Sequence, residues 1–236
     1  MRPDLVFCLR RVVLALGAGG LAAMIAACGG GGSSAGVGTG GTGSFAVGSI
    51  DAFGSIVLNG VRFEDDAAQV LDADGQLRTR QDLRLGMVVE VLASDLEPDA
   101  QGSLRTAQAQ TIRYGSEMLG PVEAVDPLGR TLTVLGQRID VPDNAVIDID
   151  GEPRSFDTAG FAAGQLVEVH GYLNVLGNGR YTATRIERMA GPVEAYRLRG
   201  TVRELDPAAQ RFRLGNLWVV AGARIGEFTE GQRVRV

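Results

Sequence analysis

The sequence predicts an all-β protein made of tandem five-stranded small barrels, of which the third is incomplete. One glycine-led pattern occurs three times, as Gly164-Gln-Leu-Val-Glu-Val-His-Gly171, Gly86-Met-Val-Val-Glu-Val91 and Gly231-Gln-Arg-Val-Arg-Val236. Its spacing of roughly 65–80 residues is typical of a repeated domain. The 34 glycines and the 6% aromatic content favour short strands and many turns over long helices.

Residues 1–27 form a targeting segment that does not belong to the fold. Three arginines, Arg2, Arg10 and Arg11, precede an apolar run from Val12 to Ala27. That run is too short to span a bilayer comfortably, and small residues follow it, as in a secretion signal.

The end of this segment resembles the lipobox of bacterial lipoproteins, which has an aliphatic residue, two small residues and then cysteine. Ile25, Ala26, Ala27 and Cys28 match it in order, with isoleucine where leucine is more usual. The resemblance implies cleavage before Cys28 and acylation, by palmitate among other chains, at its thiol and new amino group. The alternative is an ordinary signal peptide with a cysteine there by chance.

Residues 28–44 are the expected anchor and tether, because Gly29 to Gly43 is almost entirely glycine, serine and threonine. Such a segment is a flexible coil with a reach on the order of 20 Å. In Gram-negative lipoproteins, a residue other than aspartate after the cysteine favours transfer to the outer membrane, and here it is Gly29. Cys8 lies in the cleaved part, so the mature chain has no free thiol for a disulfide, a metal or a nucleophile.

Each repeat is expected to open with a three-stranded meander. In repeat 1, residues 45–118, the Asn59-Gly60 turn between alternating apolar residues is a strong hairpin signal. Repeat 2 covers residues 119–191 and repeat 3 covers 192–236. The expected meander strands are 47–51, 55–58 and 61–63, then 121–125, 131–135 and 138–141, and finally 200–205, 211–214 and 217–220.

A polar stretch of short-helix character, such as 154–163, follows each meander and leads into the glycine-led strand. In repeats 1 and 2 a closing strand comes next, at 105–112 and 181–187. Strict alternation would put Ala183, Arg185 and Glu187 on the face opposite Thr182, Thr184 and Ile186. The order β-β-β, helix or loop, β-β is that of an OB-like barrel, in which closure removes exposed edges. A small sandwich is the alternative.

The repeat resembles the bacterial family known as domain of unknown function 5666, over most of residues 47–236. The matching positions are Gly120, Val122 and Val125, then Gly164, Val167 to Val169 and Gly171, then Ala183, Thr184 and Ile186. These motifs are structural, so the resemblance implies no active site. Repeat 1 departs from the pattern by having Leu92-Ala93 in place of the second glycine.

Repeat 3 stops at Val236. By comparison with residues 170–187 of repeat 2, it lacks about 18 residues. An open barrel leaves unpaired backbone groups at an edge. Three interpretations stay open: the chain is a fragment or truncated product, another segment of the chain covers the edge, or a partner donates a strand.

Two Asp-x-Asp-Gly segments are weak candidates for cation binding. Asp72 and Asp74, and Asp148 and Asp150, lie in register in repeats 1 and 2. Both segments lack the glutamate that completes a calcium loop, and Asp-Gly is also a common hairpin turn. No cofactor or metal is therefore expected.

Other candidate residues are few. His170, the only histidine, is expected on the outward face of its strand beside Glu168, without a nucleophile. Trp218 is expected in the core. No catalytic residue is predicted, and the protein is not expected to be an enzyme.

Charge is unevenly divided along the chain. Acids outnumber arginines in residues 28–191, whereas arginines outnumber acids in 192–236. Five of these arginines could form a docking face for phosphate-bearing lipid or polysaccharide, or simply a solvated strand face: Arg197, Arg199, Arg203, Arg211 and Arg213. The net charge of −5 disfavours nucleic acid.

Two functions fit these observations. The first is a non-catalytic lipoprotein of the cell envelope, anchored in the membrane by lipid, whose barrels have a binding or structural role toward an envelope protein or polysaccharide. The second is an envelope barrel that binds a small ligand or a divalent cation through the acidic faces of repeats 1 and 2.

Overall fold

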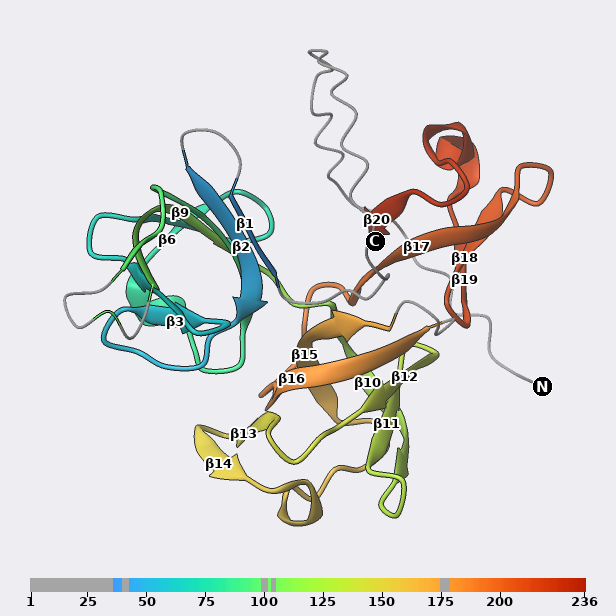
Figure 1. The fold of residues 1–236 in the computed structure, drawn as a ribbon. Helices are drawn as coiled ribbons and strands as arrows, with labels where there is room; N and C mark the ends of the chain where they lie inside the picture. The colour runs from blue at the N-terminus through green and yellow to red at the C-terminus, as the bar shows by residue number, and fades with distance from the viewer. Residues whose placement is uncertain (1–35, 40–42, 99–101, 103–104, 175–178) are drawn as a thin grey trace.

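The computed structural model describes residues 36–39, 43–98, 102, 105–174 and 179–236, and it confirms an all-β chain of small barrels. Figure 1 shows a first barrel in blue and green, a second barrel in green to orange, and a third, smaller unit in red. The segment expected to be a targeting signal, and Cys28, lie outside the described residues.

The first barrel has five principal strands in the order β2-β7-β9-β4-β3. These are β2 (Ser44–Ser49), β3 (Ile56–Leu58), β4 (Val61–Glu64), β7 (Val88–Ala93) and β9 (Arg105–Tyr114). β9 runs antiparallel to β7 and parallel to β4. The ring closes where the Asp51 N–H, just after β2, donates to the Val57 carbonyl at 2.9 Å. Two short strands, β1 (Gly36–Thr39) and β8 (Glu97–Pro98), pair with β2 and β9.

The second barrel is closed by strand pairing throughout. Its strands are β10 (Met118–Asp126), β11 (Thr131–Val134), β12 (Gln137–Asp140), β15 (Leu166–Leu173) and β16 (Arg180–Arg188). The pairs β10-β11, β11-β12, β12-β16, β16-β15 and β15-β10 complete the ring, and only β12-β16 is parallel. This is the predicted OB-like arrangement, and a two-sheet sandwich is not formed.

The third unit is a four-stranded sheet joined to the second barrel. It contains β17 (Arg197–Asp206), β18 (Arg211–Leu214), β19 (Leu217–Val220) and β20 (Arg233–Arg235), with a 3-10 helix η3 (Gly222–Glu227) between the last two. β17 pairs with β18, β20 and, through Leu198, with β10. Among the residues that the structure describes, none pairs with the outer edge of β19.

Two short hairpins were not part of the expected strand order. They are β5-β6 (Gln69–Leu71 and Leu77–Arg78) and β13-β14 (Val146–Ile149 and Glu152–Arg154). Their second strands are fully exposed, so no alternation of apolar residues marks them in the sequence. The expected short helices are single 3-10 turns, η1 (Arg80–Asp82) and η2 (Phe156–Thr158).

A backbone turn explains why the repeated pattern starts with glycine. Gly86, Gly164 and Gly231 have φ angles of 78°, 88° and 82°, in the left-handed region that residues with a Cβ avoid. The turn directs the chain into β7, β15 and β20, so the three segments share one local conformation.

A β-bulge changes which residues of the closing strand face the core. Gly171 pairs with Ala183, whereas its neighbour His170 pairs with Arg185, so Thr184 is an extra residue. The bulge switches the strand's faces, which puts Ala183 and Ile186 together in the core and turns Arg185 outward. The prediction of strict alternation was therefore wrong. β9 has a matching irregularity beside Ala93.

The buried apolar side chains form two clusters. One fills the first barrel, around Phe63, Val91 and Ile112. The other is continuous through the second barrel and the third unit and includes Tyr181 and Phe212. Gln137, which is completely buried, links the second barrel to the third unit, because its Nε2 donates to the carbonyls of Leu135 in the barrel and Leu214 in the third unit, at 2.8 and 2.9 Å.

The first and second barrels are in direct contact. The Thr184 hydroxyl donates to the Gly86 carbonyl at 2.6 Å, and a Cβ on Gly86 would lie 2.5 Å from the Thr184 carbonyl oxygen. The turn that begins β7 thus packs against the bulge of β16, and only glycine fits there. The barrels are held together by specific contacts.

Candidate functional site

The outer faces of the three glycine-led strands meet where the two barrels and the third unit join. Val89, Val167 and Val234 occupy matching places, because they pair with Gly48, Gly120 and Gly200. The next residue in each strand is therefore equivalent and faces outward: Glu90, Glu168 and Arg235. Glu168 and Arg235 line one small cavity, and Glu90 lines an adjoining groove.

The cavity, which we call the junction cavity, has a volume of about 110 Å³. The first barrel contributes residues of the β5-β6 hairpin together with Met87 and Tyr114, and the second contributes Glu168 and His170. Gly115 and Ser116, between the barrels, line it too. Arg197 and Arg235 come from the third unit, so all three parts of the fold are needed to form the cavity.

His170 lies in the wall of the junction cavity and is only 2% exposed. It faces away from the core of its own barrel, as predicted, but the first barrel covers it. Burial lowers the pKa of His170 to about 4, and the nearby positive charge of Arg185 acts in the same direction. The imidazole is therefore neutral at pH 7.

One nitrogen of this imidazole has no partner. The ring hydrogen-bonds to the backbone of Gly115, while Nδ1 contacts no donor or acceptor among the described residues. Ser116 lines the same cavity, which sequence reasoning did not anticipate. A nucleophile and its base must share a hydrogen bond, and none is formed between Ser116 and His170 within the described structure.

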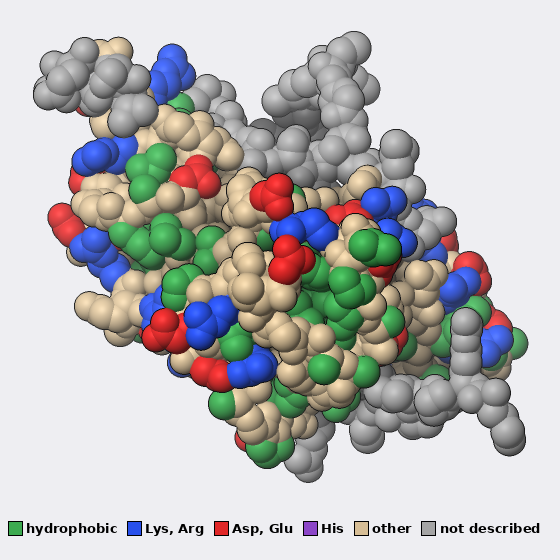
Figure 2. Space-filling view, turned by 90° about the horizontal axis from the view of Figure 1, so that it is seen from below, with side chains coloured by type: hydrophobic (Ala, Val, Ile, Leu, Met, Phe, Trp, Pro, Cys, Tyr) green, Lys and Arg blue, Asp and Glu red, His purple; other side chains and the backbone are tan. Residues whose placement is uncertain are grey.

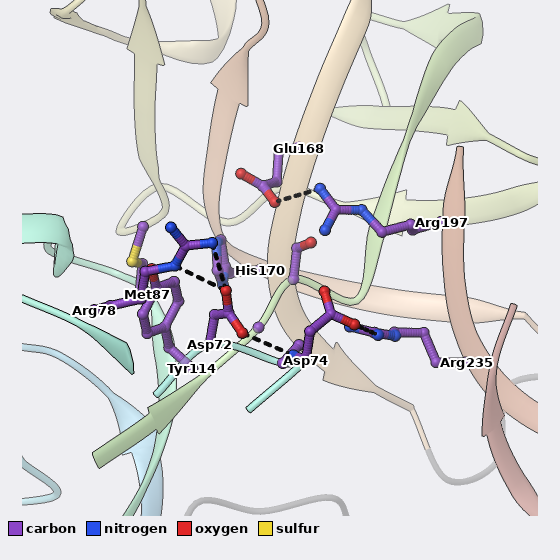
Figure 3. Close-up of a pocket in the computed structure, with 12 residues that line it drawn as sticks. Asp72, Asp74, Arg78, Met87, Tyr114, Glu168, His170, Arg197 and Arg235 are labelled. Carbon is purple, nitrogen blue, oxygen red and sulfur yellow. Dashed lines mark hydrogen bonds and ion pairs between the residues drawn. The ribbon is translucent and has the colours of Figure 1, made fainter. Parts of the chain in front are cut away.

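Three ion pairs surround the cavity, as Figure 3 shows. Arg78 contacts Asp72 at 2.6 Å, Arg197 lies 3.9 Å from Glu168, and Arg235 contacts Asp74. Burial acts to raise the pKa of Asp72, but hydrogen bonds from the Gln76 backbone, Arg78 and the Asp74 backbone outweigh it and lower this pKa overall. The carboxylates are thus matched one to one by guanidinium groups.

A buried carboxylate supports the junction from beside the cavity. Glu117, 5% exposed, receives two hydrogen bonds of 3.1 Å from Arg233, and Arg199 lies 3.9 Å away. Burial raises the pKa of Glu117, although both arginines act to lower it. Arg233 belongs to β20, so this pair ties the end of the third unit to the start of β10.

The four aspartates considered for cation binding are separated into two hairpins. Asp72 and Asp74 lie at the junction, whereas Asp148 contacts Arg185 at 2.7 Å and Asp150 contacts Arg188. All four side chains thus have an arginine partner. Within the described residues, no three or more histidine, cysteine, aspartate or glutamate side chains are grouped so that they could hold a metal ion.

Both segments are hairpin turns. The Asp72 carboxylate accepts from the N–H groups of Asp74 and Gln76 at 2.9 Å, and Asp148 accepts from the N–H of Gly151 at 2.8 Å. The geometry of these turns therefore explains why the Asp-x-Asp-Gly sequence occurs in both repeats.

The five arginines proposed as a docking face each lie within 4.0 Å of a carboxylate. The pairs are Arg197 with Glu168, Arg199 with Glu117, Arg203 with Glu230, Arg211 with Asp206, and Arg213 with Glu204. Charges of both signs are also interspersed on the face drawn in Figure 2. The arginines resemble a solvated, paired strand face more than a phosphate-binding patch.

The prediction that Trp218 is a core residue was wrong. It lies on the outer face of β19, where the guanidinium carbons of Arg211 and Arg213 are 4.3 and 5.5 Å from the centre of its rings. The next residue, Val219, points inward and is 1% exposed. The indole is stabilised by cation–π contacts in place of apolar packing.

Arg185 is the main residue that sequence reasoning missed. Its side chain is 4% exposed and contacts Asp148 at 2.7 Å and Glu187 at 2.8 Å. Its Nη1 also reaches the Leu85 carbonyl of the first barrel, at 3.4 Å. No sequence signal marks Arg185, because its burial depends on the bulge and on the neighbouring barrel.

Comparison with known proteins gave one match. A family model described as domain of unknown function (DUF5666) matches residues 120–187. No curated protein and no solved structure matches the chain. The matched residues extend from β10 to the end of β16 and contain the closing strand, the glycine-led strand and the Asp148 hairpin. The family model therefore covers the second barrel, which is the part of the chain that is similar to DUF5666.

Proposed function

We propose that the chain is a non-catalytic, lipid-anchored protein of the bacterial cell envelope whose barrels bind an envelope protein or polysaccharide. The observation that carries the anchor is the Ile25-Ala26-Ala27-Cys28 sequence, followed by a linker of glycine, serine and threonine. Membrane attachment through lipid needs no spanning helix, and none of the helices in the described part of the chain is long and apolar enough to be one.

The arrangement of the barrels supports a binding role. Arg185 and Thr184 fix the second barrel against the first, and Gln137 and Glu117 fix the third unit against the second. Loops and outer strand faces are then presented in a constant geometry, as a recognition surface requires. A DUF5666 domain is compatible with such a role.

The chemistry of the junction favours binding over catalysis. The carboxylates that line the junction cavity with His170 are paired with arginines, so they are not available to orient the imidazole as a general base. We therefore expect no hydrolytic activity that depends on His170.

Metabolic labelling with radioactive palmitate tests the anchor. The native protein is expected to incorporate label and to fractionate with membranes, and Cys28→Ser is expected to do neither. Cys8→Ser is the matched control, because Cys8 lies before the expected cleavage site, and it should be labelled normally. Equal labelling of the native protein and Cys28→Ser would reject the anchor.

Separation of inner and outer membranes on a density gradient tests the location. Because Gly29 follows the cysteine, we expect the labelled protein in the outer-membrane fraction of a Gram-negative host. In-cell crosslinking followed by mass spectrometry would then identify the protein or polysaccharide partner.

The alternative function is the binding of a divalent cation, and calorimetry with calcium distinguishes it from the function proposed here. We expect no heat when calcium is added, because an arginine contacts each candidate aspartate. Heat that disappears in Asp72→Ala or Asp148→Ala would favour the cation instead.

A further inference from the structure

The first two barrels each have a closing strand whose place is not filled by any described residue in the third unit. In the first barrel β9 runs parallel to β4 and antiparallel to β7, and in the second barrel β16 runs parallel to β12 and antiparallel to β15. The third unit, red in Figure 1, contains the strands that correspond to these partners, β19 and β20. Within the part of the chain that the structure describes, β19 and β20 therefore each keep one edge without a neighbouring strand.

The pairing registers show where a closing strand would lie. Val219 has the place in β19 that Ile139 has in β12, and Val234 has the place in β20 that Val167 has in β15. In the second barrel the closing strand passes between these positions, and its Tyr181 pairs with Ile139. An equivalent strand in the third unit would pass between Val219 and Val234.

Apolar side chains along this path are less covered than their equivalents in the closed barrels. Leu217 and Val234 pack against the core of the third unit but are only partly buried. The residue equivalent to Leu217 in the first barrel is Val61, which is 7% exposed, and those equivalent to Val234 are Val89 and Val167, which are fully buried. β9 lies beside Val61 and Val89, and β16 lies beside Val167. A strand added to the third unit would bury the same apolar surface, which favours its binding.

The backbone of β19 is suited to accept this strand. In the second barrel the Arg138 N–H donates to the Gly179 carbonyl, next to the start of β16, at 2.8 Å. Trp218 has the place of Arg138, and alternation directs the Val220 N–H to the same edge. An unpaired edge is a template for another strand unless charge, proline or a bulge blocks it. The sequence of β19, Leu-Trp-Val-Val, has no charge or proline, and its pairing with β18 has no bulge.

The two closing strands indicate which side chains such a strand needs. Both have the pattern apolar-x-Ala-x-x-Ile, in which the bulge supplies the extra residue before isoleucine. The residues of this pattern face the core and are at most 6% exposed; they are Ala107, Ala109 and Ile112 in β9, and Tyr181, Ala183 and Ile186 in β16. The occupant is therefore an extended polypeptide with small and apolar side chains on one face.

We propose that the free edges of β19 and β20 form a docking site for an extended segment of a partner protein that has this pattern. The segment adds to the third unit as its closing strand, parallel to β19 and antiparallel to β20. In strand addition of this kind, main-chain hydrogen bonds supply affinity and the alternate side chains supply specificity. The proposal rests on the binding role given above and names its class of partner, but it does not depend on the lipid anchor.

A peptide with the sequence of residues 180–188 tests the site, because it carries the pattern in Tyr181, Ala183 and Ile186. The peptide is labelled with fluorescein, and the full chain is solubilised in a mild detergent. The fluorescence anisotropy of the peptide is expected to rise and saturate as the chain is added. The matched control is the same peptide with Tyr181→Asp and Ile186→Asp. It should bind more weakly by about tenfold or more, since both aspartates would have to be buried.

Two substitutions at Val220 test the edge itself. Val220→Pro removes a backbone donor from the free edge, whereas Val220→Thr keeps this donor and the branched side chain. Val220 is 43% exposed, so we expect both variants to fold, and circular dichroism verifies this. The proline variant should bind the peptide more weakly by about tenfold, the effect of one lost hydrogen bond. The threonine variant should bind like the native chain. If Val220→Pro does not fold, the comparison of the two peptides decides the result.

Three results would overturn the proposal: no saturable binding to the native chain, equal binding of the two peptides, or equal binding by the native chain and folded Val220→Pro. Sedimentation of the native chain as a dimer and of Val220→Pro as a monomer would also overturn it, because the edge would then pair with a second copy. Palmitate labelling and in-cell crosslinking are measured separately. The anchor and the general binding role would therefore stand if only the peptide test failed.

Discussion

Replacement of Arg185 by methionine is expected to destabilise the protein strongly. The methionine keeps a long apolar side chain but leaves Asp148 and Glu187, which are 22% and 35% exposed, without their cation. Breaking a fully buried pair costs about 3–5 kcal/mol. Because both carboxylates keep some contact with water, we expect a loss of about 2–4 kcal/mol in the free energy of unfolding. The bond to the Leu85 carbonyl of the first barrel is lost as well.

Arg188→Met is the matched control three residues along the same strand. Arg188 pairs with Asp150, but the two side chains are 28% and 57% exposed. An exposed pair of this kind contributes at most about 1 kcal/mol. The contrast therefore isolates the effect of burial from the effect of removing an arginine.

Urea denaturation followed by fluorescence and by circular dichroism measures both variants. Trp218, the single tryptophan, reports on the third unit, whereas circular dichroism reports on all strands. In Arg185→Met, the two signals are expected to separate because the first barrel unfolds independently. A loss for Arg185→Met no greater than that for Arg188→Met would refute the inference that buried Arg185 holds the second barrel against the first.

Three further perturbations test other parts of the structure. Because the pKa of His170 falls from 6.5 when unfolded to about 4 when folded, its contribution to stability is complete above pH 6.5 and is lost as the pH falls toward 4. The free energy of unfolding should thus fall by about 2 kcal/mol between pH 7 and pH 5 in urea titrations, and an unchanged dependence in His170→Gln would contradict this. Gly171→Ala would place a Cβ 2.2 Å from the Thr182 carbonyl oxygen. We therefore expect urea titration to show that the free energy of unfolding falls by about 1–3 kcal/mol. A fall below about 0.5 kcal/mol would show that the two strands can move apart to accommodate the methyl group. Gln137→Leu removes the bond to the Leu214 carbonyl, and thermal unfolding should show a loss of about 1–3 kcal/mol; native stability would mean that this bond does not join the units.

Most of the barrel architecture could be predicted because its signals are local. Asn59-Gly60 marks a hairpin through two residues that accept positive φ, of 52° and 75°. Alternating valines in the glycine-led strands mark the core face, and the glycine before them marks the left-handed turn. Each of these features depends on the conformation of a few neighbouring residues, so each is visible in the sequence.

The errors occurred where one segment is packed against a distant one. The sequence of the closing strand contains no sign of the Thr184 bulge, because the bulge is defined by the register with β15. Trp218 was assigned to the core because it is hydrophobic. In β19, however, side chains alternate so that Val219 faces the core, and two arginines cover the indole on the other face. The exposed second strands of the short hairpins lack any apolar pattern.

The sequence by itself determined the repeated turn and strand pattern and the small all-β units, because these are set by residue type and short-range geometry. Only the tertiary structure decided that His170 is buried, that Arg185 links two barrels, and that Glu168, Asp72 and Arg235 surround one cavity. Burial and charge pairing depend on which surfaces meet, and surfaces that meet here come from segments separated by as many as 161 residues, as in the contact of Arg235 with Asp74.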